Sequence, residues 1–275
     1  MPKWVWLALA AAVLGISSGG VLAVLAEGVE PVPKAMWRTG LCALVLAPWW
    51  RRLGWKDLGL MALAGAMLAA HFWTWFMSLD SISVMRSVVL VTLAPLWVGL
   101  AEWGLTRERP ANRFWLGIGI ALGGVVMMGW AGLGEANLMG DALAVIGGLF
   151  SSAYFLLGRS LRQRIHWATY AGMVSGFSAL WLLPVALVLG LPLTGFAPAS
   201  WAALAGLALF PQLVGHGGFN LALGHVKASR VATMILLEPV GATLLALVVL
   251  GQVPGAVEVA GGVLIMVGVG VSQKT

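Results

Sequence analysis

Long apolar stretches alternate with short polar or charged interruptions along the whole chain. Division at the charged residues and at Pro and Gly gives ten apolar runs, at 4–26, 35–50, 57–79, 84–105, 113–132, 140–158, 166–190, 200–223, 231–250 and 255–272. A helix that crosses the hydrocarbon core of a bilayer needs about 20 largely apolar residues. Most runs have this length, and the run at 35–50 needs one more turn. The pattern predicts ten transmembrane helices joined by short connections, without a sizeable soluble domain.

The composition supports this prediction and excludes other classes of protein. Apolar residue types make up 60% of the 275 residues, charged types make up 9%, and the mean hydropathy is +0.95. A soluble domain of this size lacks enough polar side chains for its surface, and disorder requires low hydrophobicity. Cys42 is the only cysteine, which excludes a disulfide scaffold. We therefore expect an all-α polytopic membrane protein. Because nine runs follow the first, we expect that first run to be an uncleaved helix rather than a removed signal.

The placement of the basic residues predicts the orientation in the membrane. With a cytoplasmic N-terminus, all but three of the 16 Lys and Arg residues fall on inner segments, the exceptions being Lys34, Arg38 and Arg86. Basic residues concentrate in cytoplasmic loops, so both termini are predicted to be cytoplasmic, in an inner membrane of bacterial type. This bias also accounts for the net charge of +6. Anionic lipid head groups are sufficient partners for these side chains, and we expect no nucleic-acid partner.

The second half of the sequence repeats features of the first half. A shift of 144 residues aligns five pairs without a gap, namely Arg86 with Arg230, Pro95 with Pro239, Pro110 with Pro254, Gly117 with Gly261 and Gly124 with Gly268. Ser17 and Ser18 correspond to Ser151 and Ser152 at a shift of 134. The expected units are residues 1–132 and residues 140–275. Each has five spans, an odd number, so the two units must cross the membrane in opposite senses.

Such inverted repeats are the architecture of alternating-access transporters, which place their site near the midplane where the repeats meet. A receptor or a scaffold has no comparable need for this symmetry. The sequence therefore favours a secondary transporter whose halves rock about a central site. Helices three, four, eight and nine are expected to line that site, and helices one and six to move.

Several segments resemble the ten-helix EamA-type branch of the drug/metabolite transporter superfamily. They are Trp37-Arg38 in the second run, 92–96 in the fourth, 219–223 in the eighth, 236–240 and 250–252 around the ninth, and 261–269 in the tenth. Gln252 departs from the resemblance, because the family usually has Glu there, and so does the loop 107–109. The resemblance implies two five-helix repeats and the transport of small metabolites, often the export of amino acids.

Ionisable residues inside a membrane span are costly and are candidates for function. Glu238 precedes Pro239 early in the ninth span, where it is a cation ligand, a proton carrier or a structural partner of a neighbouring helix. Arg38 in the second span is a structural ion-pair partner or a carboxylate clamp, and we expect Arg86 to reach outward to lipid head groups. Pro95 and Pro239 are predicted to kink their helices.

Two polar stripes are expected to line the site. The third span carries His71, Trp75 and Ser78, and the eighth carries Gln212, His216 and Asn220 at helical spacing. The two histidines occupy nearly equivalent places in the two halves. Trp75 and Tyr154 are aromatic candidates for a substrate wall. His71 and Glu238 are the candidates for coupling, with protons as the driving ion.

No motif for an enzyme, a nucleotide, a metal or a cofactor is present in the sequence, so we expect a transporter that is not an enzyme and needs no cofactor. The favoured substrate is a small amphipathic metabolite, in particular a neutral or aromatic amino acid that leaves the cell. The alternative is an organic cation or drug held by Glu238 and tryptophans. A non-transporting scaffold or an intramembrane enzyme is a more distant alternative. The number of subunits is open.

Overall fold

The computed structural model describes residues 2–107, 109–130, 137–250 and 253–273, and their regular structure is entirely helical. In the first half the helices are α1 (Lys3–Ser17), α2 (Gly19–Leu25), α3 (Pro31–Val45), η1 (Ala47–Trp49), α4 (Trp55–Leu79), α5 (Val84–Val91), α6 (Ala94–Thr106) and α7 (Asn112–Gly129). In the second half they are α8 (Leu138–Arg162), α9 (Trp167–Val188), α10 (Pro198–Leu207), η3 (Ala208–His216), α11 (Gly217–Leu223), α12 (Ala228–Ile235), α13 (Glu238–Leu250) and α14 (Ala256–Gln273).

These helices account for all ten apolar runs. Eight stretches of described residues are long and apolar enough to cross a membrane, and α7 and α3 are shorter. Two boundaries differ clearly from the predicted ones. α3 begins at Pro31 rather than at 35, because proline fits the first turn of a helix, and α8 continues past 158 to Arg162. The fold is that of an all-α polytopic membrane protein.

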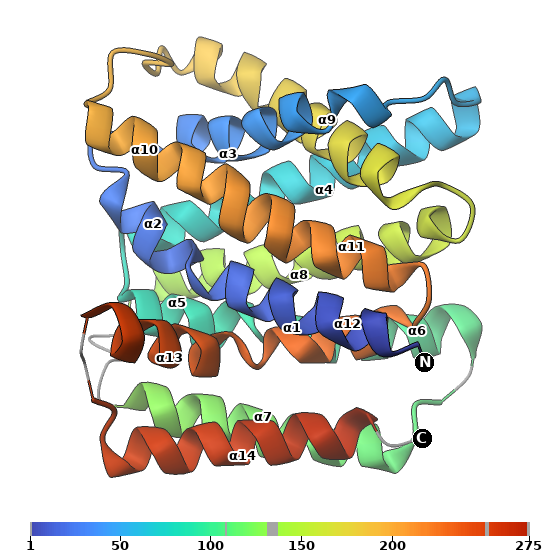
Figure 1. Cartoon of the computed structure of the whole chain (residues 1–275), viewed down its shortest axis with the longest axis vertical. Helices are drawn as coiled ribbons and strands as arrows, with labels where there is room; N and C mark the ends of the chain where they lie inside the picture. The colour runs from blue at the N-terminus through green and yellow to red at the C-terminus, as the bar shows by residue number, and fades with distance from the viewer. Residues whose placement is uncertain (1, 108, 131–136, 251–252, 274–275) are drawn as a thin grey trace.

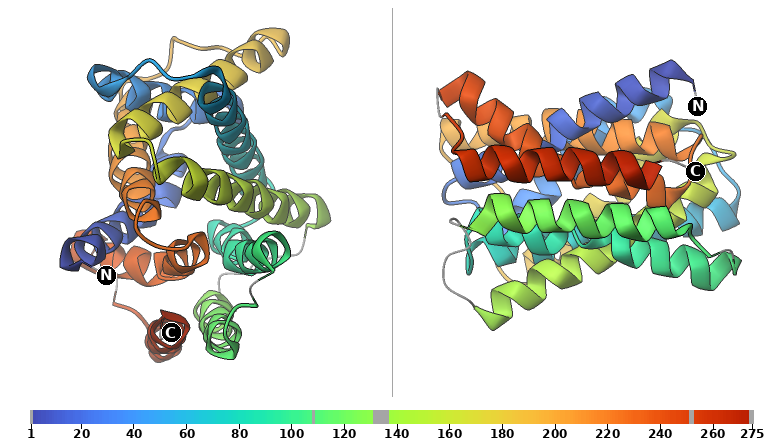
Figure 2. Two further views of the ribbon diagram at one scale, coloured as in Figure 1. Left: turned by 90° about the vertical axis from the view of Figure 1, so that its right-hand side faces the viewer. Right: turned by 90° about the horizontal axis from the view of Figure 1, so that it is seen from below.

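Large apolar side chains cover the outside of the helix bundle. Leu7 is 72% exposed, Val188 is 86% exposed and Val248 is 81% exposed. Continuous apolar surface of this kind is unfavourable in water but suits contact with lipid tails. Most helices run in a common direction, to which α4 and α8 are inclined, and the N-terminal end of α1 and the C-terminal end of α14 lie at the same end of the bundle (Figures 1 and 2).

The internal repeat is visible in the helix boundaries. α12, α13 and α14 begin 144 residues after α5, α6 and α7 respectively. α7 and α14 lie side by side at one edge of the molecule (Figure 1) and run antiparallel. A Cβ atom on Gly124 would lie 2.6 Å from the Gly261 carbonyl oxygen, and one on Gly117 would lie 2.5 Å from the Gly268 carbonyl oxygen. The shift of 144 residues relates Gly117 to Gly261 and Gly124 to Gly268, so each of the two contacts is the symmetry equivalent of the other. An inverted repeat requires this relation.

Pro95 and Pro239 interrupt their helices instead of kinking them. α5 ends at Val91 and α6 begins at Ala94, and α12 ends at Ile235 and α13 begins at Glu238. Proline lacks an N–H group and its ring collides with the carbonyl four residues earlier, so the helix stops before it and restarts with proline in its first turn. Two shorter helices thus replace one continuous helix in each half.

Two serine hydrogen bonds join the halves at these interruptions. Ser17 Oγ donates to the carbonyl oxygens of Val13, at 2.7 Å, and Glu238, at 3.0 Å. Ser152 Oγ donates to the carbonyl oxygens of Gly148, at 2.7 Å, and Ala94, at 3.1 Å. We call these two contacts the serine clasps. They show that Ser17 corresponds to Ser152, 135 residues later, so the predicted pairing of the serines at a shift of 134 is wrong by one residue.

Candidate functional site

A cavity lies in the middle of the bundle, between helices of both halves. Its wall consists of Ile16, Gly19, Arg38, His71, Phe72, Trp75, Val91, Ala94, Ser151, His216, Phe219, Ile235 and Glu238. Its volume is about 50 Å³, room for a few water molecules at about 10–15 Å³ each. The three breaks between α1 and α2, α5 and α6, and α12 and α13 are each flanked by lining residues. The passage of anything larger than water requires the surrounding helices to separate.

Arg38 carries the positive charge of this cavity. The side chain is 2% exposed and lies two turns inside α3. Its Nε donates to Gln212 Oε1 at 3.0 Å, and Gln212 Nε2 donates to Ser175 Oγ at 3.2 Å. The guanidinium carbon lies 3.8 Å from the centre of the Phe72 ring. This packing and the Nε bond fix the guanidinium, and the described residues provide no hydrogen bond to its two Nη groups.

Glu238 supplies the acidic group of the cavity. It is the first residue of α13, and its backbone carbonyl accepts the Ser17 clasp. Within the described residues the ion pairs are Arg86–Asp141 and Arg164–Asp57, so Arg38 and Glu238 do not touch each other. The guanidinium of Arg38 and the carboxyl group of Glu238 therefore face one cavity without forming an ion pair with each other.

Both predicted histidines line the cavity, one from each half. His71 Nδ1 lies 2.9 Å from the Gly147 carbonyl oxygen, which can only accept, so the hydrogen of a neutral His71 ring is on Nδ1 and Nε2 is an acceptor. The His216 ring centre lies 6.2 Å from that of His71 and 5.2 Å from that of Phe72. His216 Nδ1 is buried without a hydrogen-bond partner among the described residues.

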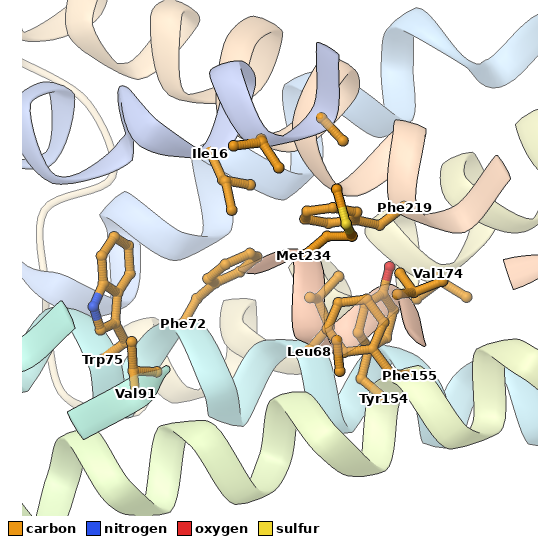
Figure 3. Close-up of a cluster of buried hydrophobic side chains, with 14 of the residues drawn as sticks. Ile16, Leu68, Phe72, Trp75, Val91, Tyr154, Phe155, Val174, Phe219 and Met234 are labelled. Carbon is orange, nitrogen blue, oxygen red and sulfur yellow. The ribbon is translucent and has the colours of Figure 1, made fainter. Parts of the chain in front are cut away.

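Phe72, Trp75 and Phe219 are the aromatic residues of the cavity wall, and Tyr154 and Phe155 pack beside it. Figure 3 shows Phe72 at the centre, with Trp75 toward one end of the bundle and Tyr154 and Phe155 toward the other. Trp75 is 5% exposed, and its Nε1 has no hydrogen-bond partner within the described residues. A buried indole N–H normally has an acceptor. The Trp75 N–H departs from this pattern.

The other predicted site residues lie around the cavity but outside its wall. Ser78 Oγ donates to the Trp75 carbonyl oxygen at 2.7 Å and lies 2.6 Å from Ser87 Oγ. Tyr154 Oη donates to Asn220 Oδ1 at 2.6 Å. The predicted stripe of Gln212, His216 and Asn220 is divided, because 208–216 is π-helical and no longer repeats every 3.6 residues.

Sequence reasoning missed two features of the cavity wall. Ile16 and Gly19 enter it because α1 ends at Ser17 and α2 begins at Gly19. The run Ser17-Ser18-Gly19-Gly20 was the available signal for that break. Phe72 stacks on Arg38 but lies within an apolar segment, so its residue type alone gave no indication of its position. The first span, through Ile16 and Gly19, and the sixth span (α8), through Ser151, therefore line the site as well.

The prediction for Arg86 is wrong, because this side chain pairs within the protein instead of reaching the head groups. Arg86 Nε and Nη2 donate to the two carboxylate oxygens of Asp141 at 2.5 and 2.7 Å, which links α5 to α8. The two side chains are each 21% exposed. Sequence gave no indication of this pair, because the two residues are far apart along the chain.

A larger cavity opens near the end of the bundle at which α2 ends. It has a volume of about 470 Å³ and is lined by 23–24, 26–31, Lys34, Leu79 and Asp80. We call it the vestibule. Lys34 Nζ donates to the Ala23 carbonyl oxygen at 2.9 Å. Burial raises the pKa of the Asp80 carboxyl, and the charge of Lys34 partly opposes this effect.

Comparison with known protein families gives a match in each half of the chain. The model of the EamA-like transporter family matches residues 2–130 and again residues 138–272. The chain belongs to this transporter family. The observation agrees with the resemblance of the motifs, and it establishes a multi-pass membrane protein of the drug/metabolite transporter type.

Individual relatives agree with this assignment. An uncharacterized transporter of Archaeoglobus fulgidus is 26% identical over 98% of both chains. The uncharacterized transporter YwfM of Bacillus subtilis is 24% identical over 92% of this chain and 87% of its own. A probable flippase subunit of Klebsiella pneumoniae, ArnE, for 4-amino-4-deoxy-L-arabinose-phosphoundecaprenol, is 36% identical over 28% of this chain and 64% of its own. A crystal structure with a TM-score of 0.83 and 19% identity covers 99% of this chain and 98% of its own, and so shows the same fold.

Proposed function

We propose that this transporter carries a small zwitterionic metabolite, namely a neutral or aromatic amino acid or a related compound, out of the cell by alternating access. The observation that carries the proposal is the pair of separated charges on one cavity. Arg38 presents two Nη groups that can bind a carboxylate in a bidentate manner. Glu238 on the same cavity can accept from an ammonium group. Phe72, Trp75 and Phe219 supply apolar contact for a side chain.

The charge of the cavity separates this substrate class from its main rival. An organic cation would interact favourably with Glu238 and the aromatic rings. It would also have to lie beside the buried guanidinium of Arg38, whose charge repels it in a medium of low polarity. A zwitterion interacts favourably with both groups at once. This difference favours an amino acid over an organic cation as the substrate.

Thermal stabilisation of the purified protein by a ligand panel tests the substrate class. A ligand that binds only the folded protein raises its melting temperature in proportion to the logarithm of its concentration. We expect stabilisation by neutral and aromatic amino acids, and none by the amines that lack their carboxylate. Stabilisation by quaternary amines alone would refute the zwitterion and favour the cation exporter.

Coupling and orientation belong to the same proposal. We infer that a proton gradient drives transport through His71 and Glu238, the titratable groups of the cavity besides His216 and Arg38. His71→Ala and Glu238→Gln variants, assayed with and without the gradient, test this role. Equal stimulation of transport by the gradient in both variants and in the wild type would refute it.

The basic residues at the end with both termini support an inner membrane with that end in the cytoplasm. Reporter fusions at each terminus test the orientation.

A further inference from the structure

The vestibule lies directly beyond the central cavity. On three helices a residue that lines the cavity is four positions, about one helical turn, from a residue that lines the vestibule, as with Gly19 and Ala23, Arg38 and Lys34, and Trp75 and Leu79. The indole edge of Trp75 lies at Gly19, where an added Cβ would be 3.5 Å from it. A single layer of side chains thus separates the two spaces at this end of the bundle.

The internal repeat assigns a counterpart to each main wall residue of the vestibule. The shift of the serine clasps pairs Ala23 with Gly158, and the shift of 144 residues pairs Leu79 with Leu223 and Asp80 with Gly224. Lys34 is the fourth residue of α3, and Tyr170 is the fourth residue of α9. These four counterparts gather at the opposite end of the bundle.

At that end the counterparts are packed together instead of enclosing a space. Tyr170 and Leu223 are both 0% exposed. A Cβ on Gly158 would lie 2.8 Å from Tyr170 Oη and 3.0 Å from Leu223 Cδ1. One end of the pathway therefore has an open vestibule of about 470 Å³, and the equivalent place at the other end is filled.

Two arginines of α8 hold this filled end. Arg159 Nη1 donates to the Leu223 carbonyl oxygen at 2.7 Å, and Arg162 Nε donates to the Asn220 carbonyl oxygen at 2.7 Å. Both carbonyls belong to the last turn of α11, whose carbonyls lack partners within the helix and favour cations. The equivalents of the two arginines at the vestibule are Val24 and Glu27, and among the described residues no cation binds the last carbonyls of α4 in the same way.

We propose that Gly158, Tyr170, Leu223 and Gly224 form a second vestibule, closed in this structure, through which the substrate passes at the face opposite the open one. Arg159 and Arg162 close it by binding the C-terminal carbonyls of α11. Release of these carbonyls lets α11 move away from α8 and opens the second vestibule. The inference rests on the proposed transport function for its purpose, but its geometry concerns only the protein.

Cysteine accessibility in the full-length protein tests the gate without any substrate. In a Cys42→Ala background, the symmetry-related probes are Leu79→Cys in the open vestibule and Leu223→Cys in the closed one. Reaction with a polar maleimide should label the first and spare the second. Adding Arg162→Ala should raise labelling of Leu223→Cys by about tenfold, because it removes a charge-assisted hydrogen bond, and should lower labelling of Leu79→Cys as that end closes.

Two controls keep the outcome interpretable. Arg164→Ala removes a nearby charge whose pair with Asp57 is largely exposed and should leave both probes unchanged. Arg162→Lys keeps the charge and should restore part of the protection of Leu223→Cys. Unchanged labelling in Arg162→Ala would overturn the gate, and so would a rise at both probes, which indicates loosened packing. Because no substrate is added, a failure here leaves the amino-acid proposal to its own binding test.

Discussion

Replacement of Arg38 by methionine separates the carboxylate-binding role of this residue from its structural role. Methionine keeps an unbranched apolar chain beside Phe72 but removes the charge and all the N–H donors. Gln212 then loses the bond that it accepts from Arg38 Nε, at 3.0 Å. That loss affects the protein equally whichever ligand is bound, so it cancels when two ligands are compared.

The size of the effect follows from the groups that Arg38 leaves without a bond. Its two Nη groups have no hydrogen-bond partner among the described residues and can make two charge-assisted bonds to a carboxylate. Each such bond contributes about 1.5–3 kcal/mol, so the pair contributes about 3 kcal/mol at the lower end. This corresponds to a loss of affinity of about 150-fold for an amino acid. The matching amine, which has no carboxylate, should lose little.

Titration calorimetry with an amino acid and its decarboxylated amine measures both affinities in wild type and Arg38→Met. Wild type should prefer the amino acid strongly, and the variant should bind the two compounds with similar affinity. Arg52→Met, which removes an exposed arginine of a loop, should keep the wild-type preference. An equal loss of affinity for both ligands, or an unchanged preference, would refute the carboxylate clamp.

Five further variants test three other parts of the account. Ser17→Ala and Ser152→Ala should each lower the free energy of unfolding, measured by chemical denaturation, by about 1 kcal/mol. An unchanged free energy of unfolding in both variants would contradict the clasps. Gly268→Leu should cost about 1–3 kcal/mol through overpacking against α7, whereas Gly270→Leu, with open space around Gly270, should leave the melting temperature unchanged. Glu238→Gln should weaken amino-acid binding by about tenfold or more through loss of the ammonium contact, and calorimetry that finds full affinity would exclude this contact.

The fold was predictable because the membrane dictates both the length and the hydrophobicity of each helix. The repeat was readable from residues with backbone roles, such as Pro95 and Pro239. The sequence did not show how the chain would respond to those prolines, because a kink and a complete interruption begin with the same residue. The choice depends on contacts with distant segments, such as the hydrogen bonds from the hydroxyls of Ser17 and Ser152 to the carbonyls of Glu238 and Ala94.

The site was predictable only in part. The cavity brings together Arg38, His71, Trp75, His216 and Glu238, which the sequence singled out because polar or amphipathic groups inside a membrane span are costly. Pairing between distant segments was not readable. The Arg86–Asp141 pair, for example, depends on how α5 meets α8. The π-helical turn at 208–216 also changed which residues of its helix share a face.

Uptake of a labelled aromatic amino acid into proteoliposomes that contain the purified protein tests the central claim most directly. The account predicts flux above that of protein-free vesicles, competition by unlabelled amino acids but not by their amines, and loss of flux in Arg38→Met. Flux of quaternary amines with no movement of any amino acid, or equal flux in wild type and Arg38→Met, would contradict it.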